Sequence, residues 1–134
     1  MNYVRNAIYT ALEADDTLLA LLGDEDNSII GTREALDSTS KPFLLVEFAG
    51  SRHRVHIGHQ TWAIYCYHDR QPEAAAKILK QVKDDLNQQS VSSDSDGGIA
   101  VMECEYMGDT PDDYDRLLRL DINGHLYRVY VRDI

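Results

Sequence analysis

Three histidines at intervals of three residues are the first candidates for chemistry in this sequence. On a helix, His53, His56 and His59 would share one face, where imidazole side chains can hold a metal ion together. The apolar and glycine residues between them instead predict a strand end or a turn, in which this spacing sends side chains to opposite faces. We therefore predict no metal site here. Together with Arg52 and Arg54, the histidines form a basic segment that we expect to be an arm meeting a neighbouring subunit.

A second segment, Ser92–Glu103, has the spacing of a calcium-binding loop. Its third and fifth positions are Asp94 and Asp96, its sixth is glycine and its twelfth is glutamate. The first position holds serine where aspartate is usual, and the residues at its end alternate like a strand where an EF-hand continues as a helix. A calcium-dependent binding module therefore stays only an alternative function.

No catalytic arrangement is apparent. The sequence has no G-x-S-x-G motif, no phosphate-binding glycine loop and no dinucleotide-binding motif. The adjacent acids Asp84-Asp85 and Asp112-Asp113 fall at a helix end and in a turn, where carboxylates usually face solvent. Cys66 and Cys104 lie in apolar, strand-like segments and are expected to be buried thiols. We predict that the protein is not an enzyme and that it holds no metal or cofactor.

The charge of the chain is concentrated in one stretch. Ten of its 23 acidic residues lie between Asp84 and Asp115, a stretch without lysine or arginine, and the net charge is −10. Such a stretch disfavours duplex DNA binding, because phosphates are neutralised by Lys and Arg. It suits a solvated face, a basic partner, or a surface past which DNA slides.

The length of 134 residues predicts a single domain over residues 1–134. No apolar run is long enough to cross a membrane. Residues 1–5 lead into a helical pattern rather than the apolar core of a signal peptide, so we expect the protein to fold in a cytoplasm.

Apolar periodicity predicts an α+β fold, in which an antiparallel or mixed β-sheet carries two helices packed on one face. The first helical segment, residues 2–22, should break near Ala14-Asp15, and the second helix should begin at Pro72. Strands are expected over residues 29–30, 43–48, 62–67 and 100–106, with polar connections over residues 24–27, 31–41, 51–59 and 88–98 and an acidic turn over residues 108–115.

The pair Asn123-Gly124 predicts a C-terminal β-hairpin. It is the pair preferred in a type I′ turn, and residues 116–122 and 125–132 alternate on either side of it. A two-residue turn at this point would pair Ile122 with His125 and Leu120 with Tyr127.

The order and spacing of these elements resemble the tail terminator, or tail-completion, family of tailed bacteriophages of the siphophage type. The resemblance runs over nearly the whole chain, but Ser90–Gly98 and Asp109–Asp115 do not contribute to it. The segments that carry it are Ala14–Gly23, Ile29-Ile30, Lys41–Glu47, Trp62–Tyr67, Ala74–Lys83 and the closing hairpin.

The resemblance implies a structural virion protein that forms a ring, typically hexameric, on the head-proximal end of the tail tube. The ring would end tube polymerisation and join tail to head. The implied partners are further copies of the chain, the major tail tube protein and a head-completion or connector protein, while DNA passes through without specific binding. The implied location is the virion, after assembly in the host cytoplasm.

For the subunit interface we expect a basic group on one copy and an acidic group on its neighbour. The expected interface residues are Arg52, His53, Arg54, Asp112, Asp113 and Asp115.

An alternative function from another class is an acidic inhibitor that mimics DNA.

Overall fold

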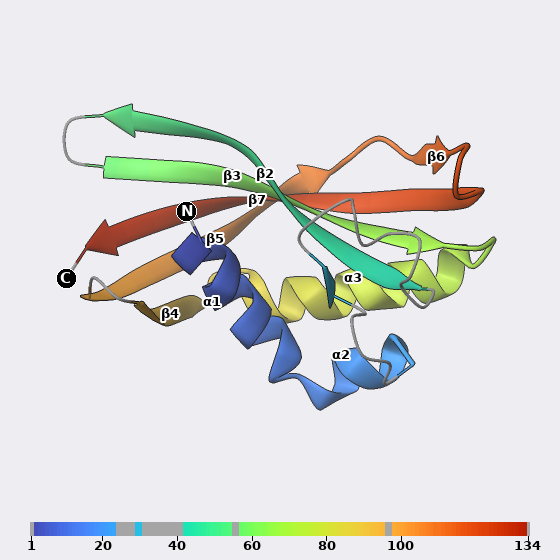
Figure 1. The fold of residues 1–134 in the computed structure, drawn as a ribbon, viewed down its shortest axis with the longest axis horizontal. Helices are drawn as coiled ribbons and strands as arrows, with labels where there is room; N and C mark the ends of the chain where they lie inside the picture. Colours follow the sequence, from blue (N-terminus) through green and yellow to red (C-terminus); the bar gives the residue numbers. More distant parts are fainter. Residues whose placement is uncertain (1, 24–28, 31–41, 55–56, 96–97, 134) are drawn as a thin grey trace.

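The computed structural model describes residues 2–23, 29–30, 42–54, 57–95 and 98–133 (Figure 1). Only the backbone is described for residues 2–3, 30, 51–54, 57–58, 90–95, 98–102 and 131–133. The polar connections expected over residues 24–27 and 31–41 lie outside the described residues. The elements in chain order are α1 (Asn2–Glu13), α2 (Asp16–Leu21), β1 (Ile29–Ile30), β2 (Phe43–Arg54), β3 (Ile57–His68), α3 (Pro72–Leu86), β4 (Ser90–Ser95), β5 (Gly98–Asp109), β6 (Asp113–Asp115) and β7 (Leu120–Asp133).

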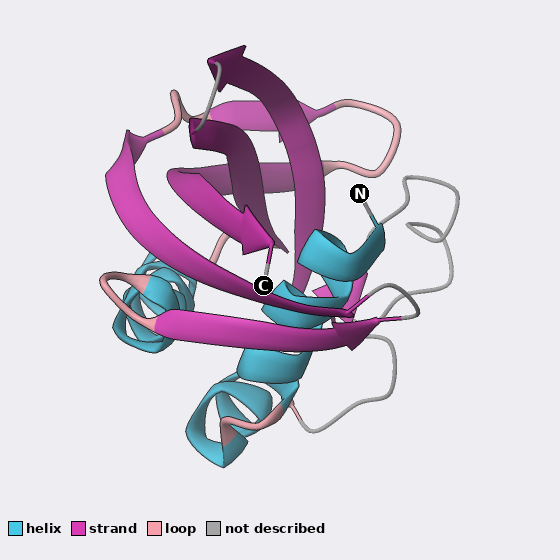
Figure 2. Ribbon diagram, turned by 90° about the vertical axis from the view of Figure 1, so that its left-hand side faces the viewer, coloured by secondary structure: helices cyan, strands magenta, loops and turns pink. Residues whose placement is uncertain are grey.

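The strands form one mixed sheet, and the helices gather on one side of it (Figure 2). The strand order is β1-β2-β3-β7-β5-β4, and β6 pairs with β7 beside β5. The β1–β2 pair is parallel and the other pairs are antiparallel. This architecture confirms the predicted α+β class.

The helices begin where the sequence predicted. The break between α1 and α2 falls at Ala14-Asp15, because Asp15 caps α2: its Oδ1 accepts hydrogen bonds from the backbone N–H of Thr17 (3.0 Å) and Leu18 (3.3 Å). Gly23 follows α2 with a φ of 89°, a conformation that costs glycine little. The longest helix, α3, begins at Pro72, whose missing N–H has no helical partner to lose.

Apolar side chains are buried on both faces of the sheet. On the helix side, Leu44, Trp62 and Tyr127 pack with the apolar faces of all three helices in the larger core. On the opposite side, a smaller cluster contains Phe43, Leu45, Tyr67 and Leu120, with Tyr65, Leu118 and Ile122 packed against it. The alternation of Phe43 and Leu44 between these clusters explains why β2 begins as a nearly continuous apolar run.

Two segments predicted to be polar connections are strands instead. Within residues 51–59, Arg52 pairs with His59 and His53 with Gly58, so β2 and β3 extend as a hairpin arm. Within residues 88–98, β4 pairs with β5, placing Asp94 opposite Ile99. The backbone groups of a strand pair are satisfied by each other whatever the side chains are, so polar composition was a poor guide here. The described residues of the calcium-like segment, 92–95 and 98–103, lie in two antiparallel strands, whereas an EF-hand loop continues as a helix.

The predicted turn at Asn123-Gly124 is wrong. Both residues lie within β7, where Asn123 pairs with Cys66 and Gly124 with Tyr65. The chain does close with a hairpin, but it joins β6 to β7 through a turn at residues 116–119. The uninterrupted pairing of β7 with β3 outweighs the local preference for a turn, which would have left that edge of β3 unpaired.

Candidate functional site

The predicted interface residues lie at two separate ends of the molecule. Arg52, His53 and Arg54 lie in the β2–β3 arm, and the aspartates lie in and beside β6 (Figure 1). The arm meets β7 at Val131 and β6 meets it at Ile122, so at about 3.3 Å per residue the two ends are about 30 Å apart. A contact between the basic and acidic groups would therefore have to join two copies of the chain, as predicted, and it stays a prediction.

The acidic end is organised by residues 110–112, which we call the crossing. They connect β5 to β6 and lie opposite the middle of β7, where the Thr110 N–H donates to the Gly124 carbonyl oxygen (2.9 Å). Any side chain at position 124 would clash with its neighbours, because an added Cβ would lie 2.6 Å from Tyr65 Cδ1 and 2.8 Å from Thr110 Oγ1. Glycine is needed here for close approach rather than for a turn.

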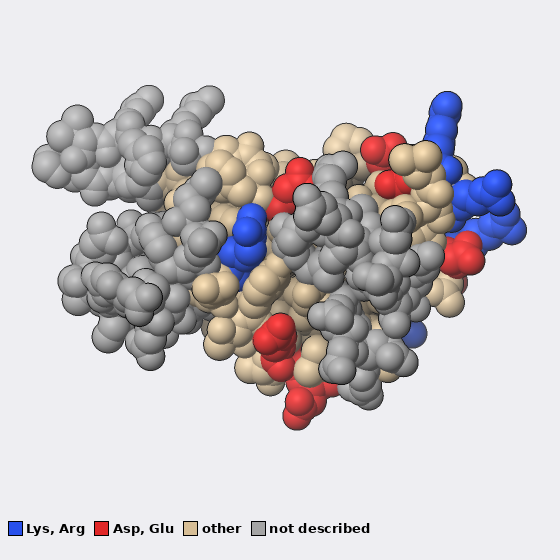
Figure 3. Space-filling model, in the orientation of Figure 1, with Lys and Arg blue, Asp and Glu red and all other residues tan. Residues whose placement is uncertain are grey.

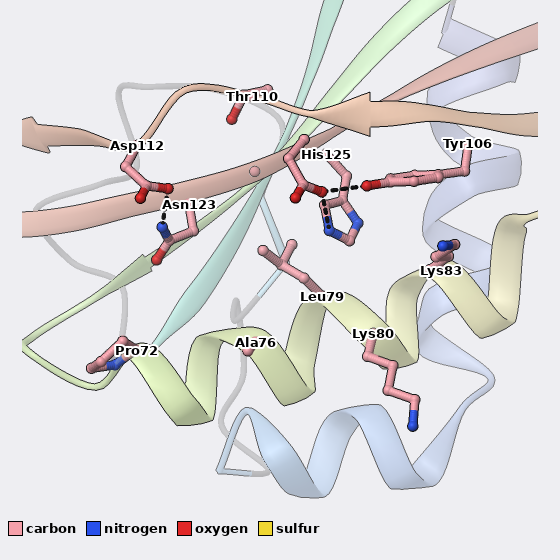
Figure 4. Close-up of a pocket in the computed structure, with 12 residues that line it drawn as sticks. Pro72, Ala76, Leu79, Lys80, Lys83, Tyr106, Thr110, Asp112, Asn123 and His125 are labelled. Atoms are coloured by element: carbon pink, nitrogen blue, oxygen red, sulfur yellow. Dashed lines mark hydrogen bonds and ion pairs between the residues drawn. The ribbon is translucent and has the colours of Figure 1, made fainter.

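Asn123 joins three elements at the crossing. The Nδ1 of the buried His68 accepts from the Gln71 N–H (3.0 Å), so His68 Nε2 carries the hydrogen and donates to Asn123 Oδ1 (2.6 Å). Asn123 Nδ2 in turn donates to Asp112 Oδ1 (2.6 Å). The chain of hydrogen bonds links the start of α3, the middle of β7 and the crossing. Figure 4 shows the bond between Asn123 and Asp112.

A cluster of polar aromatic side chains continues along the same side of β7. His125 Nε2 lies 3.2 Å from Asp109 Oδ1, and Tyr106 donates its hydroxyl hydrogen to the same carboxylate oxygen (Figure 4). Lys83 Nζ lies 4.1 Å from the centre of the Tyr106 ring. Burial lowers the pKa of His125; the charge of Asp109 opposes this shift and that of Lys83 adds to it. The pKa of Tyr106 is raised, mainly because its hydroxyl is bonded to Asp109.

Two cavities flank the crossing. One, of about 370 Å³, lies between α3 and the crossing and is bounded by Leu79, Lys83, Asn123 and His125, whereas Lys80, at its margin, points away from His125 (Figure 4). The other, of about 500 Å³, opens on the opposite face of the sheet, and we call it the acidic pocket. The residues lining the acidic pocket are Tyr65, Tyr67, Thr110, Pro111, Asp112, Asp113, Tyr114, Asp115 and Ile122.

Next to the acidic pocket, residues 116–119 form a turn that we call the tip. Leu117 is 96% exposed there, and Arg116 and Arg119 on either side are exposed as well. In Figure 3, basic side chains gather at this end of the molecule with acidic side chains beside them. An apolar side chain this exposed on a structured turn is a candidate contact residue.

A second acidic feature lies at the α2–α3 contact. Gln81 Nε2 donates to Asp15 Oδ2 (2.6 Å), and Asp85 also hydrogen-bonds to Asp15. The other oxygen of Asp85, Oδ2, is buried and has no hydrogen-bond partner among the described residues. Burial, the bond to Asp15 and the charges of Asp15 and Asp84 raise the pKa of Asp85 to about 7. Burial alone would raise the pKa of Asp15, but hydrogen bonds, first that from Asp85, lower it overall.

The acids of the 84–115 stretch whose side chains are described do not form one surface. Asp84 and Asp85 end α3 in the helix layer, whereas Glu103 and Glu105 alternate with the core residue Cys104 and so face the opposite side of β5. Glu105 accepts a hydrogen bond from Tyr130 there (3.2 Å). The stretch is therefore divided between the two sides of the sheet.

Among the described residues, no group of three or more His, Cys, Asp or Glu side chains could hold a metal ion. Cys66 and Cys104 are free and buried, as predicted, and burial raises the pKa of both thiols to about 12. In the part of the chain that is described, no helix is long and apolar enough to span a membrane.

The sequence indicated some of these residues but not their roles. It marked Asn123 and Gly124 as unusual but assigned them to a turn, and it placed Leu117 in a strand. Nothing in the pattern connected Asp109 to His125, because their pairing depends on the register of β5 with β7. The spacing that could have suggested the tip is Asp115 before Arg116–Arg119, since aspartate commonly fixes a turn two residues ahead.

The fold occurs in a known virion. A chain in the "Virion of native gene transfer agent (GTA) particle" matches with a TM-score of 0.68 over 97% of this chain and 95% of that chain, at 15% sequence identity. At this identity the match establishes a common fold. No protein-family model matches the sequence, and no curated protein matches it either.

Proposed function

We propose that the protein is a structural, non-catalytic virion subunit of the phage type, and specifically a tail terminator. In this role copies of the chain form a ring, hexameric in the family that the sequence resembles, on the head-proximal end of the tail tube. The ring ends tube polymerisation and joins the tail to the head, with the tube protein on one side and a head-completion protein on the other.

The observation that carries the proposal is the common fold with a chain of a phage-like virion particle, end to end in both chains. The apolar periodicity of the sequence predicts the same fold class, and the order of the predicted elements resembles that of tail terminators.

The distribution of charge supports a head-to-tail ring. The basic arm and the acidic crossing lie at opposite ends of the sheet, about 30 Å apart. A ring is built from heterologous contacts, in which one surface of each copy meets a different surface of the next. The basic arm of one copy, with Arg52 and Arg54, and the aspartates Asp112 and Asp113 of its neighbour are two unlike surfaces that fit that requirement.

The two alternative functions have less support. A DNA mimic needs its carboxylates on one continuous surface in place of a phosphate backbone, but the acidic stretch is divided between the two sides of the sheet. A calcium-dependent module needs a binding loop, but that segment forms the β4–β5 strand pair.

The proposal is tested by adding the purified protein to growing tail tubes and imaging the products by electron microscopy. A terminator should appear as a ring at one end of each tube and should stop elongation at substoichiometric amounts relative to the tube protein. The double variant Arg52→Glu/Arg54→Glu is the matched control, because it should remain folded and cap poorly. Tubes that elongate normally in the presence of the wild-type protein would contradict the proposal.

A further inference from the structure

The exposure of Leu117 is built into the fold. Asp115 Oδ1 accepts hydrogen bonds from the N–H groups of Leu117 (3.0 Å) and Leu118 (2.9 Å), which fixes the turn. Leu118 packs against the smaller apolar cluster, and Arg119 has a φ of 57°, so the chain reverses sharply before β7. The tip therefore presents Leu117 to solvent from an ordered position rather than from a loose end.

The acidic pocket beside the tip has complementary chemistry. Tyr65, Tyr67 and Ile122 give it aromatic and aliphatic walls, and Asp112 and Asp113 are exposed acids at its margin. Its volume of about 500 Å³ is ample for a leucine side chain. The tip carries a leucine flanked by two arginines. The acidic pocket beside it, with apolar walls and acids at its margin, suits a group of the same kind from another copy of the chain.

The charged groups of the tip are available for a partner. Within the described part of the chain, Arg116 and Arg119 form no ion pair or side-chain hydrogen bond. The Oδ1 of Asp113 accepts a hydrogen bond from the neighbouring Tyr114 N–H (2.8 Å). Guanidinium groups prefer carboxylate partners, so this end of the molecule carries unmatched charges of both signs side by side.

We propose that two copies of the free protein pair about a two-fold axis at this end, with Leu117 of each copy entering the acidic pocket of the other. A two-fold contact requires one patch that is complementary to itself, in which each copy supplies both halves. The tip and the acidic pocket are the two halves, and in the pair Arg116 of one copy lies against Asp113 of the other.

The pairing has a consequence for assembly, and this step rests on the proposed function. The two-fold contact uses Asp112 and Asp113, the same carboxylates that the head-to-tail ring contact needs. A copy cannot engage both at once, so the pair is a form in which the free protein is kept from closing rings. At the tube end, the basic arm of a neighbouring copy displaces the tip.

Sedimentation velocity over a range of concentrations tests the pairing. The wild-type protein should show a reversible monomer–dimer equilibrium, and Leu117→Glu should raise the dissociation constant more than about tenfold, because a charge replaces the buried apolar side chain. Met107→Glu is the matched control, since Met107 is also an exposed apolar residue (45%) but does not line the acidic pocket. A wild-type protein that stays monomeric, or that forms rings without dimers, would overturn the proposal, as would unchanged pairing in Leu117→Glu.

Charge exchange tests the orientation of the pair. Arg116→Glu and Asp113→Arg should each weaken the dimer, and combining them in one chain should restore it, because the new Glu and Arg then face each other across the two-fold axis. Cross-linking adds a direct check: mixed Leu117→Cys and Asp113→Cys proteins should form a disulfide, and mixed Leu117→Cys and Lys77→Cys proteins should not. The native thiols are buried and stay protonated, so they do not compete.

These outcomes separate the pairing from the terminator role. If the dimer responds to the variants as described but the protein fails to cap tubes, the two-fold contact is supported and the terminator role is contradicted. If the protein caps tubes but never pairs, the terminator role is supported and the two-fold contact is contradicted.

Discussion

Asp85 should make the protein less stable as the pH rises from 5 to 8. Its pKa is raised to about 7 in the folded protein, while in the unfolded chain it should be near the ordinary value of about 4. A group whose pKa is raised by folding stabilises the fold fully below its unfolded pKa, and this stabilisation is lost as the pH rises through the folded pKa. The loss should therefore develop between about pH 4 and pH 8.

The size of this loss of stability follows from the pKa values of Asp85 in the folded and unfolded protein. A rise from about 4 to about 7 sets a ceiling of about 4 kcal/mol on the free energy of unfolding, at about 1.4 kcal/mol for each pH unit. Asp85 is only half-buried, and solvent screens part of its interaction with Asp15 and Asp84, so we expect about 1 to 2 kcal/mol. Asp85→Asn keeps the shape and can donate to Asp15 at every pH, so it should remove this pH dependence and stabilise the protein above pH 7.

The assay is urea denaturation of the wild type and Asp85→Asn at several values between pH 5 and pH 8. The difference between the two proteins isolates the contribution of Asp85, because every other ionisable group is present in both. Asp84→Asn is the matched control, because Asp84 is exposed and its removal should leave most of the pH dependence in place. Parallel stability curves for the wild type and Asp85→Asn would refute the reasoning.

Three further variants probe the crossing and the arm. Gly124→Ala should cost about 1–3 kcal/mol in urea denaturation, because the added Cβ meets a tyrosine ring and a backbone oxygen; an unchanged midpoint would contradict the close packing. Asn123→Ala should cost a similar amount, about 1–3 kcal/mol, since it leaves the buried His68 Nε2–H without its acceptor, and proton exchange at this ring nitrogen should quicken. Arg52→Glu/Arg54→Glu should weaken rings on tubes, with the largest difference from the wild type at low salt, where surface charge pairs are least screened; rings of normal stability would remove the arm from the interface.

The sequence was a sound guide wherever one local signal fixed the structure. Asp15 stops one helix and caps the next through its own side chain, and Pro72 fits only the first turn of α3. The alternation around Trp62 and around Cys104 is a property of neighbouring residues, so both strands could be predicted. The fold class followed from the order of these segments.

Features that depend on distant pairing could not be predicted. Asn123-Gly124 has the composition of a turn, but its conformation is decided by β3, more than fifty residues earlier, and by the crossing that approaches it. The polar residues of the arm became strands for the same reason, because each pairs with a partner strand. The tip was missed because Arg116–Arg119 was assigned to a strand of the hairpin that does not form.

The most direct test of the terminator role is to delete the gene from the particle that encodes it and measure tail length by electron microscopy. A terminator limits tube growth without being needed for polymerisation, so its loss should give filled heads without joined tails, together with tubes of irregular and often excessive length. Supplying the protein in trans should restore joined tails of normal length. Complete virions with normal tails in the deletion strain would contradict the account.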